Sequence, residues 1–332
     1  MTWFEALTGF REESPSQVRQ NITLAGETLT SRVNGKKLVF GRLEMPSLAE
    51  LRQRLRSAGR SPGRISVQEV VADVQALHAD PVNAGTLFQV ASQFNLLEMV
   101  SPSVTPERGV GIYENDHTQG PACAIAAGAG TIYRNYFVPV NGQIGQSAGN
   151  QIDCLAELGE KLGNAGNRLW QMQNGYALPT HEGLAEVAQR LRDASAVELD
   201  ELRSLLRIGI QWHTQVTLNV CTHTVSQVYC SALPVAYTRL APALWEGFAR
   251  LVLEAAYEAT LCAAVLNQQT TGNRRVYLTL LGGGAFGNDT PWILDSLLRA
   301  LELNKDWDIE VAIVSYGASK PDVRQLAGRF PG

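Results

Sequence analysis

The chain has 332 residues, of which 45% are hydrophobic and 18% are charged, and its formal net charge is −4. This composition is typical of a globular protein with one large domain, or with a domain and an appendage. The negative charge argues against a general nucleic-acid binder, and no run of about 18 apolar residues suggests a membrane span.

The N-terminus and the cysteines indicate the compartment. Residues 1–5 have neither the basic start nor the apolar core of a secretory signal peptide. The five cysteines are an odd number and form no CxxC pair, which favours free thiols in a reducing compartment. We therefore expect a cytoplasmic protein, or one that a dedicated secretion machine delivers into a host cytosol.

Residues 1–80 are predicted to form a mostly helical N-terminal accessory region. Two capping boxes, Ser47-Leu48-Ala49-Glu50 and Ser66-Val67-Gln68-Glu69, predict helices that begin at these points, the second continuing to about Leu77. The polar Gly/Pro segment at 57–64 predicts a turn or hinge between them.

Residues 81–332 are predicted to form the main domain. Short apolar runs predict buried strands, and long helical patterns lie between them, the clearest from Pro242 to Asn267. Strands that alternate with helices predict an α/β sheet covered on both faces. The predicted strands are 87–91, 135–138, 215–218, 225–229, 275–280 and 308–314.

A long irregular segment, 99–119, follows the first of these strands. Loops longer than about 12–15 residues inside a compact domain are usually functional or disordered. This one leads into Gly120-Pro121 and a run of small residues to Gly130, which predicts a helix with proline in its first turn. The N-terminus of such a helix carries partial positive charge and attracts anions.

A second anion-binding loop is predicted at Leu281-Gly282-Gly283-Gly284-Ala285-Phe286-Gly287-Asn288, between a strand and a helix at 291–303. Its four glycines let backbone N–H groups approach an anion closely, and Phe286 offers a flat face to a ring. The two loops together indicate a ligand with a diphosphate and a ring. The alternative is an ordinary turn with Phe286 in the core.

These features together resemble a macrodomain, a three-layer α/β/α fold with a mixed sheet. The resemblance depends on Val90-Ala91-Ser92-Gln93-Phe94-Asn95, on the loop into the small-residue helix and on the late glycine loop, and covers about residues 86–316. The chain is most similar to the poly(ADP-ribose) glycohydrolase branch, and within it to bacterial effectors that remove ADP-ribose from modified arginine, including on ubiquitin. The glycohydrolase signature, a triple glycine followed by Gln-Glu-Glu, is absent after Asn95, which favours the effector-like enzymes.

The resemblance implies an ADP-ribose site. Asn95 would contact the distal ribose, and the start of the small-residue helix would contact the diphosphate. The late loop would wrap the diphosphate, with Phe286 packed on the distal ribose. The predicted binding residues are Asn95, Thr118, Gln119, Gly120, Gly282, Gly283, Gly284, Ala285, Phe286, Gly287 and Asn288.

Carboxylates of the long loop are the predicted catalytic groups. Cleavage at the anomeric carbon of ribose passes through an oxocarbenium-like transition state, which a carboxylate can stabilise. We predict this role for Asp116 first, and also for Glu107 and Glu98. The alternatives are that Asp116 caps the helix, that Glu107 is a solvated charge and that Glu98 is a surface charge or forms a salt bridge. No metal and no cofactor are expected, since ADP-ribose is itself ligand and product.

The sequence therefore predicts an ADP-ribosyl hydrolase that acts on a modified protein side chain, first of all arginine, with ubiquitin as one possible carrier. The alternatives are a reader that binds ADP-ribose without cleaving it, and a hydrolase of free ADP-ribose derivatives or of poly(ADP-ribose). The expected partner is an ADP-ribosylated protein, and neither nucleic acid nor a membrane is expected.

Overall fold

The computed structural model describes residues 1–59 and 63–331. Its centre is a seven-stranded sheet with the order β4-β11-β12-β6-β13-β14-β5. The five strands from β12 to β5 run parallel, whereas β4 and β11 are antiparallel to their neighbours. The strands are β4 (Arg42–Glu44), β5 (Ser66–Val71), β6 (Leu87–Ala91), β11 (Gly209–Gln215), β12 (Thr224–Cys230), β13 (Arg275–Leu278) and β14 (Glu310–Ser315).

Strand β6 occupies the middle of the sheet. Leu87 pairs with Ser226 of β12 on one side and with Val276 of β13 on the other. Four of its five residues are buried, as expected for a strand whose two faces are both covered by helices. The apolar run at 87–91 therefore reflects a central position, and its prediction as a buried strand is confirmed.

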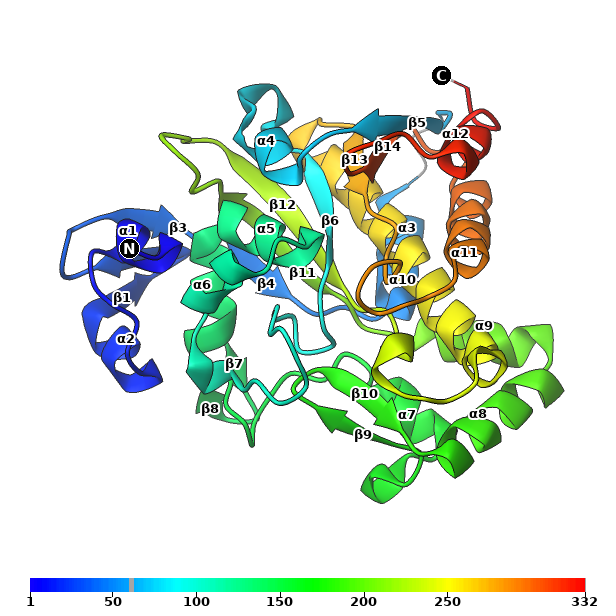
Figure 1. Cartoon of the computed structure of the whole chain (residues 1–332). Coiled ribbons are helices and arrows are strands. Elements are labelled where there is room, and N and C mark those ends of the chain that lie inside the picture. Colours follow the sequence, from blue (N-terminus) through cyan, green and yellow to red (C-terminus); the bar gives the residue numbers. More distant parts are fainter. Residues whose placement is uncertain (60–62, 332) are drawn as a thin grey trace.

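Helices cover both faces of the sheet (Figure 1). One face carries α4, α5 and α6, and the other carries the long helix α10 packed against α3, α8, α9 and α11. The predicted three-layer α/β/α arrangement with a mixed sheet is confirmed. The helices are α3 (Leu48–Ala58), α4 (Val74–Ala79), α5 (Gln119–Ala126), α6 (Gly128–Tyr136), α8 (His181–Asp193), α9 (Ala196–Ser204), α10 (Pro242–Thr271), α11 (Thr290–Leu303) and α12 (Pro321–Ala327).

Several local predictions are confirmed. Helix α10 begins at Pro242 and ends at Gly272 in the left-handed conformation, the usual places of these two residues at helix ends. Both hydrogen bonds of the capping box at Ser47 are present. The strands at 225–229, 275–280 and 308–314 correspond to β12, β13 and β14.

Other local predictions are wrong. The helix expected from Ser66 is strand β5, because its β-branched valines suit a strand and it pairs in parallel with β14. The strand expected at 135–138 begins in the last turn of α6, and the one at 215–218 lies almost entirely beyond β11. Short apolar runs do not distinguish strands from helix segments. The small-residue helix is two helices, α5 and α6, that meet at Ala127.

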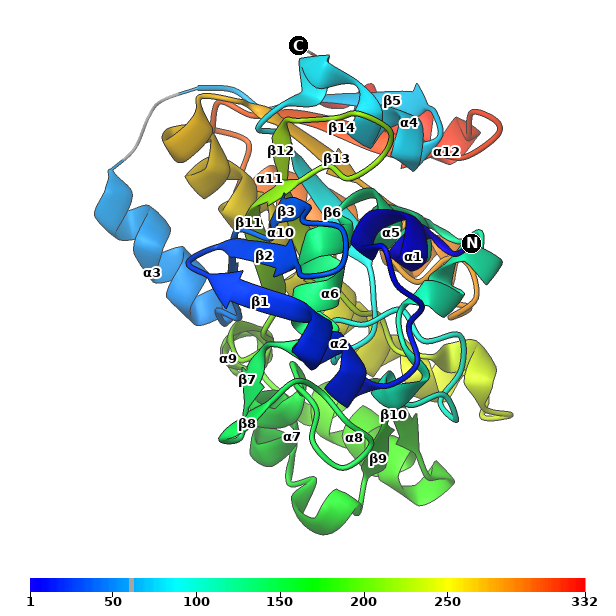
Figure 2. The same ribbon diagram turned by 90° about the vertical axis from the view of Figure 1, so that its left-hand side faces the viewer.

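The N-terminal 40 residues form a separate layer against α6 (Figure 2). Phe40 stacks on Tyr133 of α6 with ring centroids 4.1 Å apart. The expected boundary at residue 80 does not match this layer, because β4 and β5 are the edge strands of the central sheet. Part of the turn expected at 57–64 lies outside the described residues. The layer contains α1 (Trp3–Thr8), α2 (Pro15–Asn21), β1 (Ile22–Ala25), β2 (Thr28–Ser31) and β3 (Lys37–Val39).

The remaining elements are short and connect the layers. Two hairpins, β7–β8 and β9–β10, and helix α7 lie between α6 and α8 in the chain. Among the described helices, none combines the length and the apolar character that crossing a membrane requires. The bounds are β7 (Pro139–Val140), β8 (Gln143–Ile144), α7 (Ala156–Leu162), β9 (Trp170–Gln173), β10 (Tyr176–Pro179), and the 3-10 helices η1 (Pro81–Asn83), η2 (Pro106–Arg108), η3 (Gly111–Asn115), η4 (Ala165–Asn167) and η5 (Val235–Tyr237).

Candidate functional site

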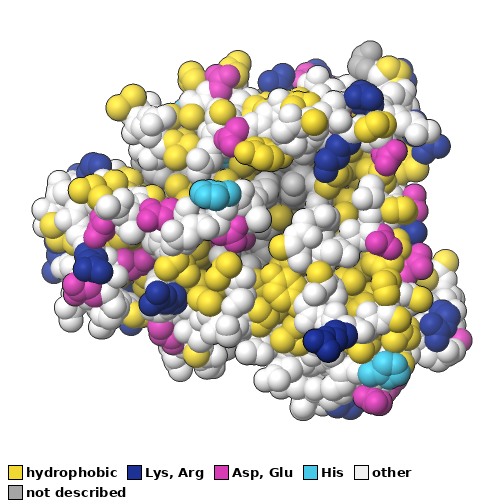
Figure 3. Space-filling model, in the orientation of Figure 1, with side chains coloured by type: hydrophobic (Ala, Val, Ile, Leu, Met, Phe, Trp, Pro, Cys, Tyr) yellow, Lys and Arg dark blue, Asp and Glu magenta, His cyan; other side chains and the backbone are white. Residues whose placement is uncertain are grey.

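A cavity of about 470 Å³ lies where the parallel strands end. Segments that follow β5, β6, β12, β13 and β14 all contribute to its lining, and the molecular surface is hollowed near the middle of this face (Figure 3). Ligands of open α/β sheets bind outside the carboxyl ends of the strands. The cavity is therefore the candidate site, and both predicted anion loops reach it.

The glycine loop after β13 forms one wall. Gly282 has φ 76°, and a Cβ there would lie 2.4 Å from Cβ of Ala232, so only glycine fits. The N–H of Asn288 donates to the carbonyl of Gly282 at 2.9 Å and closes the loop. The N–H groups of Gly284, Ala285 and Phe286 donate to no acceptor among the described residues. Successive free N–H groups beside a cavity can bind an anion.

Gly287 and Asn288, the last two predicted residues of the glycine loop, shape the loop but do not line the cavity. Asn288 is buried, and its side-chain amide donates to the carbonyl of Leu233 at 2.9 Å. Gly287 has φ 69° and packs against Ala236. The other predicted loop residues, 282–286, all line the cavity.

The N-terminus of α5 forms the opposite wall. Thr118 is the N-cap residue, but its side chain makes no capping hydrogen bond. The N–H groups of Gln119 and Gly120 have no acceptor among the described residues, so they and the helix dipole are available to an anion. A Cβ at Gly120 would lie 2.1 Å from the carbonyl oxygen of Ala91, which makes glycine necessary there.

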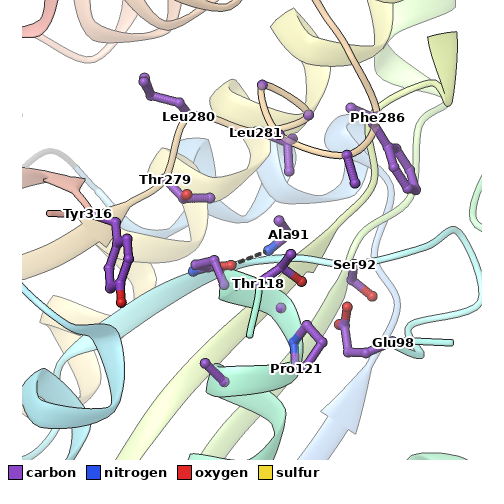
Figure 4. Close-up of a pocket in the computed structure, with 18 of the residues that line it drawn as sticks. Ala91, Ser92, Glu98, Thr118, Pro121, Thr279, Leu280, Leu281, Phe286 and Tyr316 are labelled. Atoms are coloured by element: carbon purple, nitrogen blue, oxygen red, sulfur yellow. Dashed lines mark hydrogen bonds between the residues drawn. The ribbon is translucent and has the colours of Figure 1, made fainter. Parts of the chain in front are cut away.

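The side chain of Gln119 has a structural task. Its Oε1 accepts the N–H of Ala91 at 2.8 Å, the bond drawn in Figure 4, and its Nε2 donates to the carbonyl of Gln89 at 2.8 Å. These two bonds fasten the start of α5 to the end of β6. The side-chain amide of Gln119 is therefore occupied by β6, whereas its backbone N–H has no acceptor among the described residues.

Glu98 is buried at the base of the cavity and only 4% exposed. Figure 4 shows its carboxyl pointing toward Ser92 and Pro121. Its Oε1 has no hydrogen-bond partner among the described residues. Burial raises the pKa of this carboxyl well above its usual value, although the nearby charge of Arg134 lowers it. The side chain is therefore buried rather than a surface charge, and its burial raises the pKa of the carboxyl.

Asp116 lies at the mouth of the same cavity and is partly exposed. Its Oδ1 accepts the N–H of Thr118 at 2.9 Å and the hydroxyl of Thr118 at 2.7 Å. The carboxylate thus fixes the N-cap residue itself and makes no bond to the first turn of α5. Its charge also raises the pKa of Glu98, so the two acidic groups are close enough to interact.

Besides Gly287 and Asn288, two further predicted residues do not line the cavity. Asn95 is fully buried, where its Nδ2 donates to Gln151 at 2.8 Å and its Oδ1 accepts the N–H of Leu97 at 3.1 Å. Glu107 is exposed on η2, and its Oε1 accepts the N–H of Ala148 at 2.8 Å. Both side chains hold neighbouring loops, so we do not include them in the site proposed below.

Three tyrosines that were not predicted join Phe286 in lining the cavity. Phe286 contacts Tyr176 and Tyr237, with centroids 5.3 and 5.6 Å away. Tyr316, which is 80% exposed, lies across the cavity from Phe286 (Figure 4). The three tyrosines come from β10, η5 and the segment after β14, and no local motif marks them in the sequence.

The described residues contain no group of three or more His, Cys, Asp and Glu side chains that could hold a metal ion. The cavity is lined by the carboxyl groups of Asp73, Glu98 and Asp116, by the side chains of His117 and Lys320, by backbone N–H donors and by aromatic faces.

No family model and no curated protein matches the chain. Among solved structures, poly(ADP-ribose) glycohydrolase from Thermomonospora curvata is similar at 12% identity and a TM-score of 0.46, over 94% of this chain and 96% of that one. The glycohydrolase from Deinococcus radiodurans in complex with ADP-ribose is similar at 13% identity and a TM-score of 0.47, over 97% of each chain. At these values the likenesses alone assign neither a family nor an activity.

Proposed function

We propose that the chain is a hydrolase that releases ADP-ribose by cleaving a glycosidic bond at the distal ribose. The observation that carries the proposal is Glu98, a buried carboxyl with an unpartnered oxygen at the base of a cavity. Burying a polar atom without a partner is unfavourable, and such groups are often functional.

The cavity suits the shape and charges of ADP-ribose. Its volume of about 470 Å³ lies within the usual range for small-molecule sites. A diphosphate fits between the N–H groups of Gln119 and Gly120 and those of the glycine loop. The distal ribose fits at the Phe286 end, which is the end where Glu98 lies, and adenine fits at Tyr316 (Figure 4).

Glu98 and Asp116 divide the chemistry. As the bond from the anomeric carbon to the leaving atom breaks, positive charge develops on the ribose. The carboxylate of Asp116 stabilises this charge and takes a proton from the attacking water, and protonated Glu98 donates a proton to the leaving group. Two carboxyl groups suit the roles of acid and base when their environments give them different pKa values.

Arginine is the linkage that we propose first. A guanidinium group carries positive charge, and the carboxylate of Asp116 at the cavity would attract it. Poly(ADP-ribose) is the second candidate. Its leaving group is an oxygen that needs a proton, and Glu98, whose pKa is raised, could donate that proton. Ubiquitin is one arginine-bearing carrier to include in the test.

The test compares linkages. Peptides and ubiquitin with ADP-ribosylated arginine, serine-linked ADP-ribose, poly(ADP-ribose) and ADP-ribose 1″-phosphate are each incubated with the protein, and ADP-ribose release is measured. We expect the wild type to release ADP-ribose from arginine. The rate of release should fall about 10²-fold or more in Glu98→Gln/Asp116→Asn and should be unchanged in the control Glu107→Gln. Binding of ADP-ribose without release from any linkage would identify a reader, and the absence of both would contradict the proposal.

A further inference from the structure

A carboxylate of the N-terminal layer holds the loop that precedes Asp116. Glu12, between α1 and α2, accepts the N–H of Val110 at 2.9 Å on Oε1 and the N–H of Gly111 at 2.6 Å on Oε2. The hydroxyl of Tyr136 on α6 also donates to Oε1, at 2.5 Å. Glu12 thereby ties the beginning of η3 to α6.

Two glycines leave room for this carboxylate. A Cβ at Gly109 would lie 2.5 Å from Oε2 of Glu12, and one at Gly111 would lie 2.8 Å from the same atom. Gly109 also has φ 90°, which other residues rarely adopt. The sequence Gly-Val-Gly at 109–111 is therefore shaped around Glu12. Trp3 adds two contacts, since its indole N–H donates to the carbonyl of Val110 at 3.1 Å and its backbone N–H donates to Oε2 of Glu114 at 3.0 Å.

Residue Tyr113 of η3 connects this anchor to both acidic groups. Its hydroxyl oxygen accepts the backbone N–H of Glu98 at 3.0 Å, and its carbonyl accepts the backbone N–H of Asp116 at 3.1 Å. The ring is 1% exposed and packs in the same core cluster as Phe4 of the N-terminal layer. One 3-10 helix thus fixes the backbone of Glu98 and of Asp116.

We propose that Glu12 is a positioning residue for hydrolysis: it holds η3, and through Tyr113 it sets the positions of Glu98 and Asp116. This inference rests on the function proposed above. Glu12 does not line the cavity, so its loss should slow the reaction without weakening ligand binding. Displacing reacting groups by about 1 Å can cost 10²-fold in rate.

The experiment uses the full chain and three variants. Glu12→Gln keeps the size of the side chain but removes the charge that accepts three donors, and Tyr136→Phe removes one donor only. The control is Glu13→Gln, because Glu13 is the exposed neighbour. Measurements are kcat and KM for release from arginine-linked substrate, the Kd of free ADP-ribose, and Tm.

We expect Glu12→Gln to lower kcat by about tenfold or more, with KM and Kd within about twofold of the wild type. Tyr136→Phe should lower kcat by a smaller factor. The control Glu13→Gln should match the wild type. An unchanged kcat in Glu12→Gln overturns the inference, as does a parallel loss of kcat, affinity and Tm. If that variant is unfolded, Tyr136→Phe decides by the same criteria. Binding without release by the wild type contradicts the proposed function, and this inference with it.

Discussion

The hydroxyl oxygen of Tyr113 lies 3.0 Å from the backbone nitrogen of Glu98 and accepts its N–H. Both residues are buried. This hydrogen bond joins the loop after β6 to η3, which are separated in the chain by an irregular segment. The position of the buried carboxyl therefore depends on the packing of η3 as well as on β6.

Replacing Tyr113 with phenylalanine should slow hydrolysis. The change leaves the buried N–H of Glu98 without an acceptor, which costs about 1–3 kcal/mol, and releases the loop that carries the carboxyl. We expect kcat to fall about tenfold, measured as the rate of ADP-ribose release. Tyr133→Phe is the matched control, since Tyr133 packs at the same core cluster without a hydroxyl contact to the site. Equal rates in both variants would contradict this role.

Gly282→Ala should weaken ADP-ribose binding. The added Cβ would collide with Ala232 and would have to adopt φ 76°, so the loop must move away from the diphosphate. Such strain costs about 1–3 kcal/mol, and we expect Kd, measured by calorimetry, to rise about tenfold. Gly272→Ala is the control for backbone strain. Gly272 has the same φ as Gly282, but the space around it is open and it lies at the end of α10. Wild-type affinity in Gly282→Ala would contradict the diphosphate role.

Tyr316→Ala should weaken binding without affecting stability. The side chain is 80% exposed, so its removal leaves the core intact. Stacking of a base on an aromatic ring contributes about 1–3 kcal/mol, and we expect Kd for ADP-ribose and for AMP to rise at least about fivefold at an unchanged Tm. Ile144→Ala, another exposed apolar residue, serves as the control. Unaltered affinity for both ligands would place adenine elsewhere.

Acid should destabilise the fold through His78. Burial lowers the pKa of this imidazole from 6.5 to about 4, and its ring nitrogens contact the carbonyl of Val74 and the amide of Gln227. Between pH 6.5 and 4 the unfolded chain binds a proton that the folded chain does not, so stability is full above pH 6.5 and decreases as the pH falls. The loss approaches about 3 kcal/mol at pH 4.

Denaturant unfolding at pH 7 and pH 4.5 measures this effect. His78→Gln should reduce the difference between the two free energies of unfolding, because the variant has no imidazole to protonate. His181→Gln, at an exposed position, should leave the difference as it is in the wild type. An identical pH dependence in all three proteins would show that His78 is not the responsible group.

Local motifs allowed much of the fold and part of the site to be predicted. The glycine loop and the Gly120-Pro121 helix start need only neighbouring residues, and both lie at the cavity. Ser66 shows the opposite case, since pairing of β5 with β14 overrides its helix-start pattern. The sequence did not distinguish Glu98 from Glu107, because it does not show that Glu107 is turned toward Ala148 and that Glu98 is held by Tyr113. These contacts, like the one from Glu12, join segments that the sequence alone does not bring together.

The role of Glu98 is tested most directly by the single-turnover rate of ADP-ribose release from an arginine-ADP-ribosylated peptide, measured for the wild type and for Glu98→Gln, with the Kd of ADP-ribose determined in parallel. We predict that the variant releases ADP-ribose about 10²-fold more slowly with an unchanged Kd. Release at the wild-type rate by Glu98→Gln would contradict the assignment of Glu98 as the proton donor.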